Sequence, residues 1–570
     1  EIFRGNLSRK CMERLLGHPF NSRVCKIYLS LLFVFSFIPL SVSAAGGSSG
    51  GSWKAAEMPS WAVTVAIIIL VAVYALIVFE LVHRALAAAL GGIATVAALH
   101  VATYYSPEKS TLLDGEKLLG PDLMTIMTWI DWETIGLLIG MMVMVDILSK
   151  TGLFEWAAVQ AYARSGGSIW RLTFILCVIT AVFSALLDNV TTILLIVPVT
   201  IQICKVLDLE PVPLIIAEVM FSNIGGAATQ IGDPPNIIIG AQLSNQSLSG
   251  TILEAESIGF IDFIIHVAPA VLIAMVPAFW LLRIIEKPGL SGYRRRNVDL
   301  LKIQYGIKDV ELLKKSGAIL IVVILLFFAH SQISHPLSSV AIIAIAGAVV
   351  MLLVTSPHHV EEQLDSVEWT TIIFFAGLFI MIHGLEFMGL IEMIADLISD
   401  TVSRASEGNR LMVAVLLLLW VSAIASAFID NIPYTATMVP VVIELASDPT
   451  LGLALGPLAW ALALGACLGG NGTIIGASAN VVAAGLAEES GNDISFNRFF
   501  RTGFPIMILT LLLATVYCVV RYAIEWANPI IPFVIITLLI VGSLMLTPMV
   551  YKDLENLENL DLKSLDLESE

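Results

Sequence analysis

The chain has 570 residues, of which 57% are hydrophobic and only 14% are charged. Soluble globular chains carry roughly 25% charged residues, so the charged groups here are too few to cover a particle dissolved in water. The composition therefore predicts an integral, multi-pass membrane protein that is embedded in the lipid bilayer. A formal net charge of −17 excludes the basic surface that nucleic-acid binding requires.

The first part of the chain has the pattern of a secretory signal. Basic residues precede an apolar run from Ile27 to Leu40, and small residues follow it. We expect residues 1–45 to form a signal peptide or an uncleaved signal anchor, and residues 46–60 to form an extracytoplasmic linker. This signal predicts a membrane of a secretory-pathway organelle or the plasma membrane. At the other end, residues 551–570 form an acidic tail, to which we assign no function.

Apolar segments long enough to cross a bilayer recur along the rest of the chain. We divide them into a first repeat (61–282), a second repeat (317–526) and an extra terminal span (527–550). Lysine and arginine outnumber the acids in the connecting loop 283–316, which predicts that this loop is cytoplasmic. Two longer apolar stretches, Trp170–Leu207 and Met412–Leu445, each carry a polar Asp-Asn pair in the middle.

Such an interruption is typical of a re-entrant hairpin, because irregular backbone at membrane depth is tolerated only inside protein. Polar motifs also recur in the same order in both halves. Ser184–Asn189 matches Ser426–Asn431, and the glycine-rich Gly225–Asn236 matches Gly469–Asn480. We therefore expect an all-α polytopic fold built as an inverted repeat of two five-helix units. Each unit would contain one re-entrant hairpin and one unwound transmembrane helix, with the site between the repeats.

The glycine-rich breaks predict an ion site. Glycines let a helix unwind, and Pro234 with Pro235 leaves upstream carbonyl groups without amide donors. These carbonyls would form an oxygen cage for Na⁺ with the side chains of Asn189, Thr229 and Asn236. The repeat predicts a second cage at Asn431, Thr473 and Asn480. Beyond a bound Na⁺, we expect no cofactor.

Three carboxylates lie in these motifs. Asp188 and Asp430 occupy the two hairpin tips, whereas Asp233 has no acidic counterpart in the second half. A carboxylate at membrane depth is costly, so each is a candidate for coupling to a cation or a proton. The alternative is that the tip aspartates cap local backbone amides. The repeat-equivalent pair Asp146 and His383 is either a proton relay or a pair of helix-end residues.

Glu218 is a weaker candidate for a titrating group. No lysine or arginine lies near these motifs in the sequence, so we expect only helix dipoles and a bound Na⁺ to hold an anion. The candidate ion- and substrate-binding residues are Asp188, Asn189, Thr191, Gly226, Thr229, Asp233, Pro234, Asn236, Asp430, Asn431, Thr435, Asn471, Thr473 and Asn480.

Three strings of the sequence resemble the P protein (pink-eyed dilution) family. They are Asp131–Thr134 (DWET), Leu187–Thr192 (LDNVTT) and Asn223–Asn236 (NIGGAATQIGDPPN). That family is similar to arsenite pumps, NhaD-type antiporters and divalent-anion/Na⁺ symporters. The resemblance implies a scaffold part, a moving transport part, hairpin tips that bind ions, and a homodimer. Both tips carry Asp where the symporters have Ser, which favours a cation or proton role.

We expect an ion-coupled secondary transporter that moves a small anion or anion-forming solute with Na⁺ or H⁺ by alternating access. One alternative is a Na⁺/H⁺ antiporter, and a second is an anion (chloride) channel that affects the pH of an organelle. An enzyme is not expected, because the sequence has no nucleophile–base pair, metal cluster or soluble domain, and we assign no catalytic residue.

Overall fold

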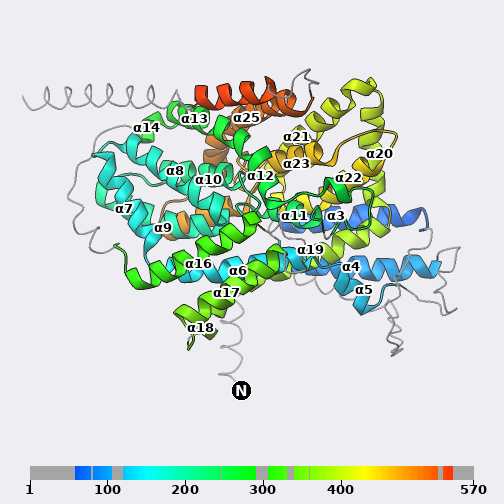
Figure 1. The fold of residues 1–570 in the computed structure, drawn as a ribbon, viewed down its shortest axis with the longest axis horizontal. Helices are drawn as coiled ribbons and strands as arrows, with labels where there is room; N and C mark the ends of the chain where they lie inside the picture. The colour runs from blue at the N-terminus through cyan, green and yellow to red at the C-terminus, as the bar shows by residue number, and fades with distance from the viewer. Residues whose placement is uncertain are drawn as a thin grey trace, which may run out of the picture.

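The computed structural model describes residues 58–78, 81–105, 120–245, 247–290, 306–329, 339–358, 360–523 and 531–543. Over these ranges the chain is helical and contains no strand (Figure 1). The predicted signal segment, most of the linker, residues 291–305 of the basic loop and the acidic tail lie outside the described residues. The expected all-α polytopic class is confirmed.

Figure 1 labels the helices along the chain. In the first half they are α3 (Trp61–Val78), α4 (Arg84–Tyr105), α5 (Leu123–Thr128), α6 (Trp132–Ser149), α7 (Leu153–Ser165), α8 (Ile169–Leu186), α9 (Asn189–Leu207), α10 (Val212–Gly226), α11 (Pro234–Gln242), α12 (Phe260–His266), α13 (Ala268–Ile285) and α14 (Lys287–Leu290). In the second half they are α16 (Val310–Ala329), α17 (Val340–Thr355), α18 (Val360–Asp365), α19 (Trp369–Phe387), α20 (Leu390–Ser403), α21 (Arg410–Phe428), α22 (Asn431–Ser447), α23 (Leu455–Gly469), α24 (Ser478–Glu489) and α25 (Phe496–Cys518).

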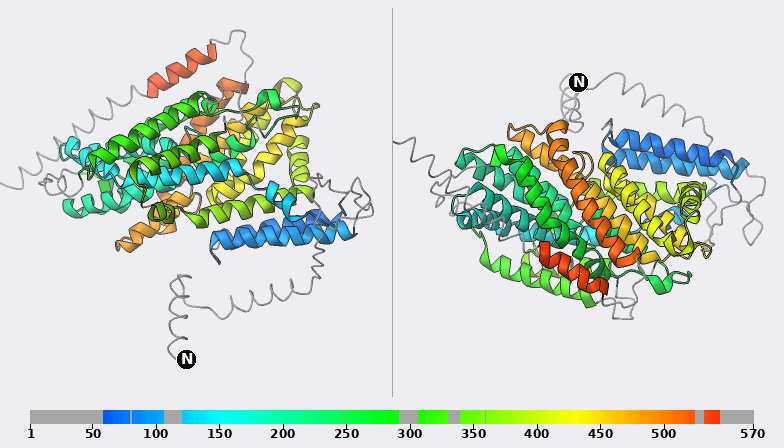
Figure 2. Two further views of the ribbon diagram at one scale, coloured as in Figure 1. Left: turned by 60° about the horizontal axis from the view of Figure 1, so that its bottom comes forward. Right: turned by 90° about the horizontal axis from the view of Figure 1, so that it is seen from above.

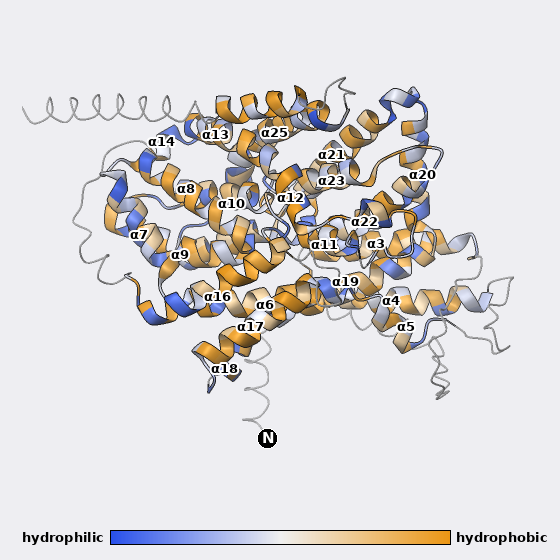
Figure 3. Cartoon of the chain, in the orientation of Figure 1, coloured by the Kyte–Doolittle hydropathy of each residue, from blue (hydrophilic) through white to orange (hydrophobic). Residues whose placement is uncertain are grey.

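Apolar side chains dominate these helices, as the hydropathy colouring shows (Figure 3). Among the described residues, nine helices are long and apolar enough to cross a membrane, and five shorter apolar helices accompany them. The apolar run that begins near Ile319 is short for a span, and its flanks extend α16 to 20 residues. Hydrophilic residues gather on α7 and α20, two helices that the apolar segments do not predict. The protein is therefore an integral, multi-pass membrane protein.

The helices break where the polar motifs predict. The backbone leaves the helical conformation at Leu187 and Asp188, which separates α8 from α9. In the second half the same change at Ile429 and Asp430 separates α21 from α22. The glycine-rich motifs separate α10 from α11 and α23 from α24. Pro234 begins α11, a position where proline's missing amide costs no helical hydrogen bond.

Helices of the two halves exchange contacts in matching pairs. Helix α4 packs along α19, and its counterpart pair is α17 with α6. Small residues allow these close contacts, because a Cβ at Gly377 would meet the backbone of Ala88, and one at Gly140 would meet the backbone of Ala344. Helix α3 lies beside α4 at one end of the molecule (Figure 2). The inverted orientation of the repeats stays a prediction.

The broken helices pack in matching pairs as well. Helix α8 packs on α10 and α21 on α23, while α9 contacts α24 and α11 contacts α22 across the halves. Each hairpin therefore touches a broken helix of its own half and one of the other. The terminal helix 531–543 lies apart from this region and contacts α13, where Ser543 donates to the carbonyl of Ile273 at 3.1 Å. The four polar motifs converge inside the molecule.

Candidate functional site: a polar cluster between the hairpins and the broken helices

The tip aspartates cap the second helix of each hairpin. Asp188 accepts from the amide of Thr191 at 2.8 Å and from its hydroxyl at 2.5 Å, so both residues are engaged with each other at the start of α9. Asp430 accepts from the amide of Ile432 at 3.0 Å at the start of α22. Its second oxygen accepts from the hydroxyl of Ser478 at 2.8 Å. The capping interpretation describes these contacts; a coupling role for the tip aspartates stays a prediction.

Two asparagines hold the helix breaks together. The side-chain amide of Asn236 donates to the carbonyls of Ala227 and Thr229, at 3.1 and 2.9 Å. Asn480 does the same for Gly470 and Thr473, at 2.7 and 2.9 Å. Several carbonyls freed by the break thus accept side-chain amides of the same motif, and the oxygen cage for Na⁺ stays a prediction. These asparagines replace the missing helical donors.

One threonine joins each break to the neighbouring hairpin. The hydroxyl of Thr229 donates to the carbonyl of Ala185 at 2.5 Å. In the second half the hydroxyl of Thr473 donates to the carbonyl of Ala427. Both acceptors lie in the last turn of the first hairpin helix, where carbonyls lack helical partners. Thr229 and Thr473 therefore fix the position of each hairpin tip relative to its break.

Asp233 lies at the centre of the cluster and is fully buried. Its Oδ1 accepts from the side-chain amide of Asn189 at 3.1 Å and from that of Asn431 at 3.3 Å. One donor comes from each hairpin, so the two halves meet at a single carboxylate oxygen. Oδ2 of Asp233 and Oδ1 of Asn189 are buried without a hydrogen-bond partner. Two buried oxygens, one on the carboxylate itself and one on the asparagine that donates to it, are thus left without a hydrogen-bond donor.

Asn223 completes the cluster and is absent from the predicted set. Its side-chain amide donates to Oδ1 of Asn471 at 3.0 Å and to Oδ1 of Asn480 at 2.9 Å, both in the other half. Its own Oδ1 accepts from Asn189 at 3.2 Å. The repeat does not single out Asn223, because its counterpart 244 residues later is Cys467. The Cys467 thiol donates to Oδ1 of Asn236 at 3.4 Å.

Other predicted residues have separate surroundings. Gly226 packs against Gly232, where a Cβ would collide with the Gly232 carbonyl, and Thr435 is buried with its hydroxyl unpartnered. Glu218 is buried in α10 and accepts from the Thr200 hydroxyl at 2.6 Å.

Asp146 pairs with Lys150 at 3.0 Å, and His383 with Glu386 at 3.1 Å. Both are contacts within one helix end, as the second of the two interpretations predicts.

A cation does reach the cluster, which corrects the expectation that none would. Arg84, the first residue of α4, donates Nη1 to the hydroxyl of Ser478 at 2.5 Å. From α3, the Tyr74 hydroxyl lies 2.7 Å from the hydroxyl of Thr437 and donates to the carbonyl of Pro433 at 2.9 Å. Arg84 is 394 residues from Ser478 along the chain, so only the packing of α3 and α4 reveals the contact.

Comparisons with known proteins agree with this architecture. The chain is 40% identical to the P protein of Sus scrofa over 531 residues, which cover 82% of this chain and 60% of that protein. It is 39% identical to an uncharacterized transporter of Mycobacterium tuberculosis over 465 residues, covering 80% of this chain and 98% of that one. The chain therefore spans about 60% of the length of the P protein that it matches.

The crystal structure of the Alcanivorax borkumensis YdaH transporter shares the fold, with a TM-score of 0.51 at 13% sequence identity. The match covers 77% of this chain and 98% of that one. Residues 74–465 match the model of the citrate transporter family, CitMHS. The matching family model, the mycobacterial relative and the structural neighbour are all transporters, and transporters are not enzymes. The chain is a membrane transporter that belongs to the citrate transporter (CitMHS) family.

Proposed function

We propose that this chain is an ion-coupled secondary transporter in which Asp233 holds the coupling cation, Na⁺ or H⁺, while a small anion or anion-forming solute is carried. The observation that supports this most directly is the surroundings of Asp233. The carboxylate is fully buried. Two side-chain amides donate to its Oδ1, and its Oδ2 has no hydrogen-bond partner. Neutral amides do not offset the cost of burying a charge. A proton or a metal cation on Asp233 does.

The neighbouring oxygens suit such a cation. Oδ1 of Asn189 is also buried without a partner, and Asn189 is hydrogen-bonded to Asp233. Carboxylate and amide oxygens are the ligands that hard cations take in proteins. Because Asn189 and Asn431 belong to different hairpins, loading or emptying Asp233 changes the contacts of both hairpins at once. This links occupancy of the ion site to the relative position of the two hairpins, which coupled transport requires.

The same carboxylate also supports the second candidate, a Na⁺/H⁺ antiporter. In that case Asp233 exchanges one cation for the other and no anion crosses with them. The two candidates differ in what else moves, because both need the unpartnered oxygen of Asp233. The family description makes citrate the first anion to test, and chloride is the second.

The test uses the purified full chain in proteoliposomes that contain a pH-sensitive dye. A Na⁺ or pH gradient is imposed, and uptake of radiolabelled citrate and chloride is measured together with proton flux. Asp233→Asn keeps the size and hydrogen bonds of the side chain but removes its charge. We expect gradient-driven accumulation to be lost, while passive exchange and folding persist. Glu218→Gln is the matched control, since it also neutralises a buried carboxyl group of the same half.

Accumulation by Asp233→Asn at the wild-type rate would contradict the proposal. Sodium-driven proton flux in the wild type without uptake of either anion would select the antiporter. Anion flux that rises linearly with concentration and ignores both gradients would select a channel.

A further inference from the structure

Arg84 links the first half of the chain to the second hairpin. Its guanidinium donates to the hydroxyl of Ser478, and that hydroxyl donates to Oδ2 of Asp430 at 2.8 Å. The guanidinium also lies over the ring of Phe374, 5.8 Å from the ring centroid. Three elements that are distant in sequence, α4, α24 and the hairpin tip, thus meet around one positive charge.

The helix ends at this point add to the positive potential. Asp430 is the N-cap of α22, a helix of 17 residues, and Ser478 is the first residue of α24, a helix of 12 residues. The amino-terminal ends of both helices therefore face the region of Arg84, and each carries partial positive charge. Within this region Asp430 is the resident negative group, and it occupies hydrogen-bond donors that an incoming anion would use.

The corresponding positions of the first half carry neither the arginine nor the serine hydroxyl. The helix that corresponds to α4 in the packing is α17, and it begins with Val340 instead of an arginine. Pro234 stands where the second half has Ser478, so no hydroxyl is present there. Asp188 is engaged by Thr191 of its own helix. The break of the first half thus carries Asp233, an acid without a cationic partner among the described residues. The break of the second half instead receives the guanidinium of Arg84. We therefore expect the first break to prefer a cation and the second an anion.

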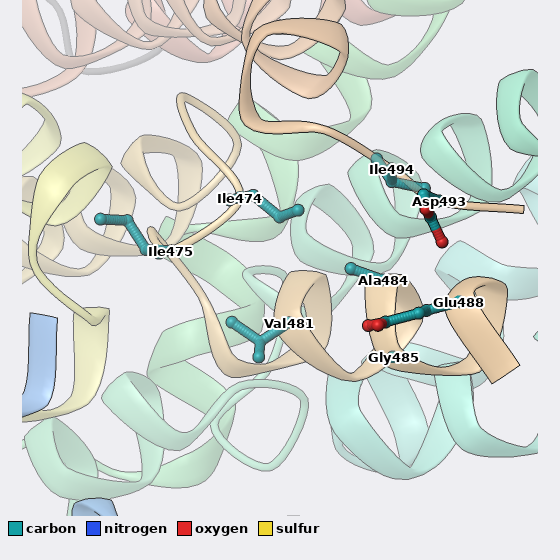
Figure 4. A pocket seen from close by; sticks show the side chains of 8 residues that line it. All are labelled: Ile474, Ile475, Val481, Ala484, Gly485, Glu488, Asp493 and Ile494. Carbon is teal, nitrogen blue, oxygen red and sulfur yellow. The ribbon is translucent and has the colours of Figure 1, made fainter. Parts of the chain in front are cut away.

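A pocket lies along α24 (Figure 4). It has a volume of about 280 Å³ and is lined by Ile474, Ile475, Val481, Ala484, Gly485, Glu488, Asp493 and Ile494. Glu488 and Asp493 lie at one end, and the break residues Ile474 and Ile475 lie toward the other. Ser478, the first residue of α24, is buried and is not among the residues that line this pocket.

We propose that Arg84, together with Ser478, binds the transported anion, and that Asp430 occupies the hydroxyl of Ser478 while no anion is bound. The inference deepens the proposed function, on which it rests, by naming the residue that recognises the anion. The ligand is a small anion whose oxygens accept N–H and O–H bonds, because a guanidinium presents several donors in a fixed fork. Binding replaces the contacts of Asp430 with those of the anion.

This competition gives opposite signs for two neutral substitutions. Arg84→Gln removes the charge that attracts the anion and should weaken binding by at least about tenfold, since charge-assisted hydrogen bonds exceed neutral ones by that much. Asp430→Asn removes the competing carboxylate and should leave binding equal or tighter. Arg84→Lys keeps the charge without the fork, and we expect an intermediate loss. If the chain of contacts from Arg84 through Ser478 to Asp430 were purely structural, no such opposition would be expected.

The experiment measures anion-dependent thermal stabilisation and equilibrium binding of the purified full chain with citrate, inorganic phosphate and chloride. Arg410→Gln is the matched control, because Arg410 also begins a helix and donates Nη1 to a neutral oxygen, the carbonyl of Thr450, at 3.0 Å. It should bind anions like the wild type. Binding needs no gradient, so this readout is separate from the coupling test on Asp233.

Two results would overturn the inference. Restoration of wild-type binding in the double variant Arg84→Gln/Asp430→Asn would mean that Arg84 only balances the charge of Asp430. Failure of all three anions to stabilise the wild-type chain would mean that no anion site exists here. If Asp233→Asn keeps full coupling while Arg84→Gln loses anion binding, the coupling assignment fails and the anion site stands.

Discussion

Asn223 donates its side-chain amide to Oδ1 of Asn480 at 2.9 Å and so joins α10 of the first half to α24 of the second. The repeat-equivalent contact, Cys467 to Asn236, is longer, at 3.4 Å, and a thiol is a weak donor. The hydrogen bond from Asn223 to Asn480 is therefore stronger than the equivalent contact from Cys467 to Asn236, although the backbone motifs of the two halves match.

This asymmetry predicts unequal costs of substitution. Asn223→Ala leaves the buried acceptors of Asn471 and Asn480 without their donor, and an unsatisfied buried acceptor costs about 1–3 kcal/mol. Cys467→Ala removes only a weak donor and one sulfur atom, so it should cost less. Thermal unfolding of both variants in the same detergent checks the order. A larger loss for Cys467→Ala would show that packing, not the asparagine network, holds the halves together here.

At Gly225, α10 packs closely against α8. A Cβ there would meet the backbone of Ala181, which cannot move as a flexible side chain would. We expect Gly225→Ala to destabilise the protein by about 1–3 kcal/mol, the typical cost of overpacking. Gly485 in α24 is the matched control, because a Cβ there meets nothing within 4 Å. Gly485→Ala should stabilise by up to about 1 kcal/mol through helix propensity. Equal unfolding temperatures for the two variants would contradict this packing.

Much of the architecture follows from local sequence signals. Long apolar runs predict spans, and the Asp-Asn pairs and glycine-rich motifs predict where helices break, because each signal acts through the backbone at its own position. The helices α7 and α20 were missed, since their polar residues interrupt the apolar pattern. Arg84 was missed because it precedes an ordinary apolar helix, and nothing local indicates that its side chain reaches Ser478.

The sequence predicts which residues gather in the polar cluster, but it does not predict their hydrogen bonds. Carbonyls that we expected to coordinate Na⁺ accept the side-chain amides of Asn236 and Asn480. A sequence lists donors and acceptors, but it does not say which of them pair with each other first. Asp233 was one of three candidate carboxylates, and only its contacts with both hairpins distinguish it from Asp188 and Asp430.

An ion pair with a buried carboxylate also joins the two halves. Glu286, which follows α13, accepts from both guanidinium nitrogens Nη1 and Nη2 of Arg498, at 2.7 and 2.5 Å, and from the hydroxyl of Thr502. Glu286 is only 2% exposed. Arg498→Ala should therefore cost about 3 kcal/mol, because it leaves a buried carboxylate without its partner.

The double variant Glu286→Gln/Arg498→Ala removes that unpaired charge. We expect it to be more stable than Arg498→Ala alone, so the two substitutions should be strongly non-additive. Denaturation of the two single variants and the double variant provides the cycle. Simple additivity would mean that the two side chains do not interact in the membrane-embedded protein.

Asp188 provides the last prediction, because it separates capping from coupling. Its carboxylate contacts the amide and the hydroxyl of Thr191, and an asparagine N-cap serves the amide equally well. Asp188→Asn should therefore keep both the unfolding temperature and gradient-driven transport near wild-type values. Asp188→Ala should lose about 1 kcal/mol of stability, the usual cost of a missing cap. Thr191→Val, which removes only the hydroxyl contact, is the accompanying control and should lie between them. Loss of coupled transport by Asp188→Asn at unchanged stability would assign the coupling proton or cation to the hairpin tip and remove that role from Asp233.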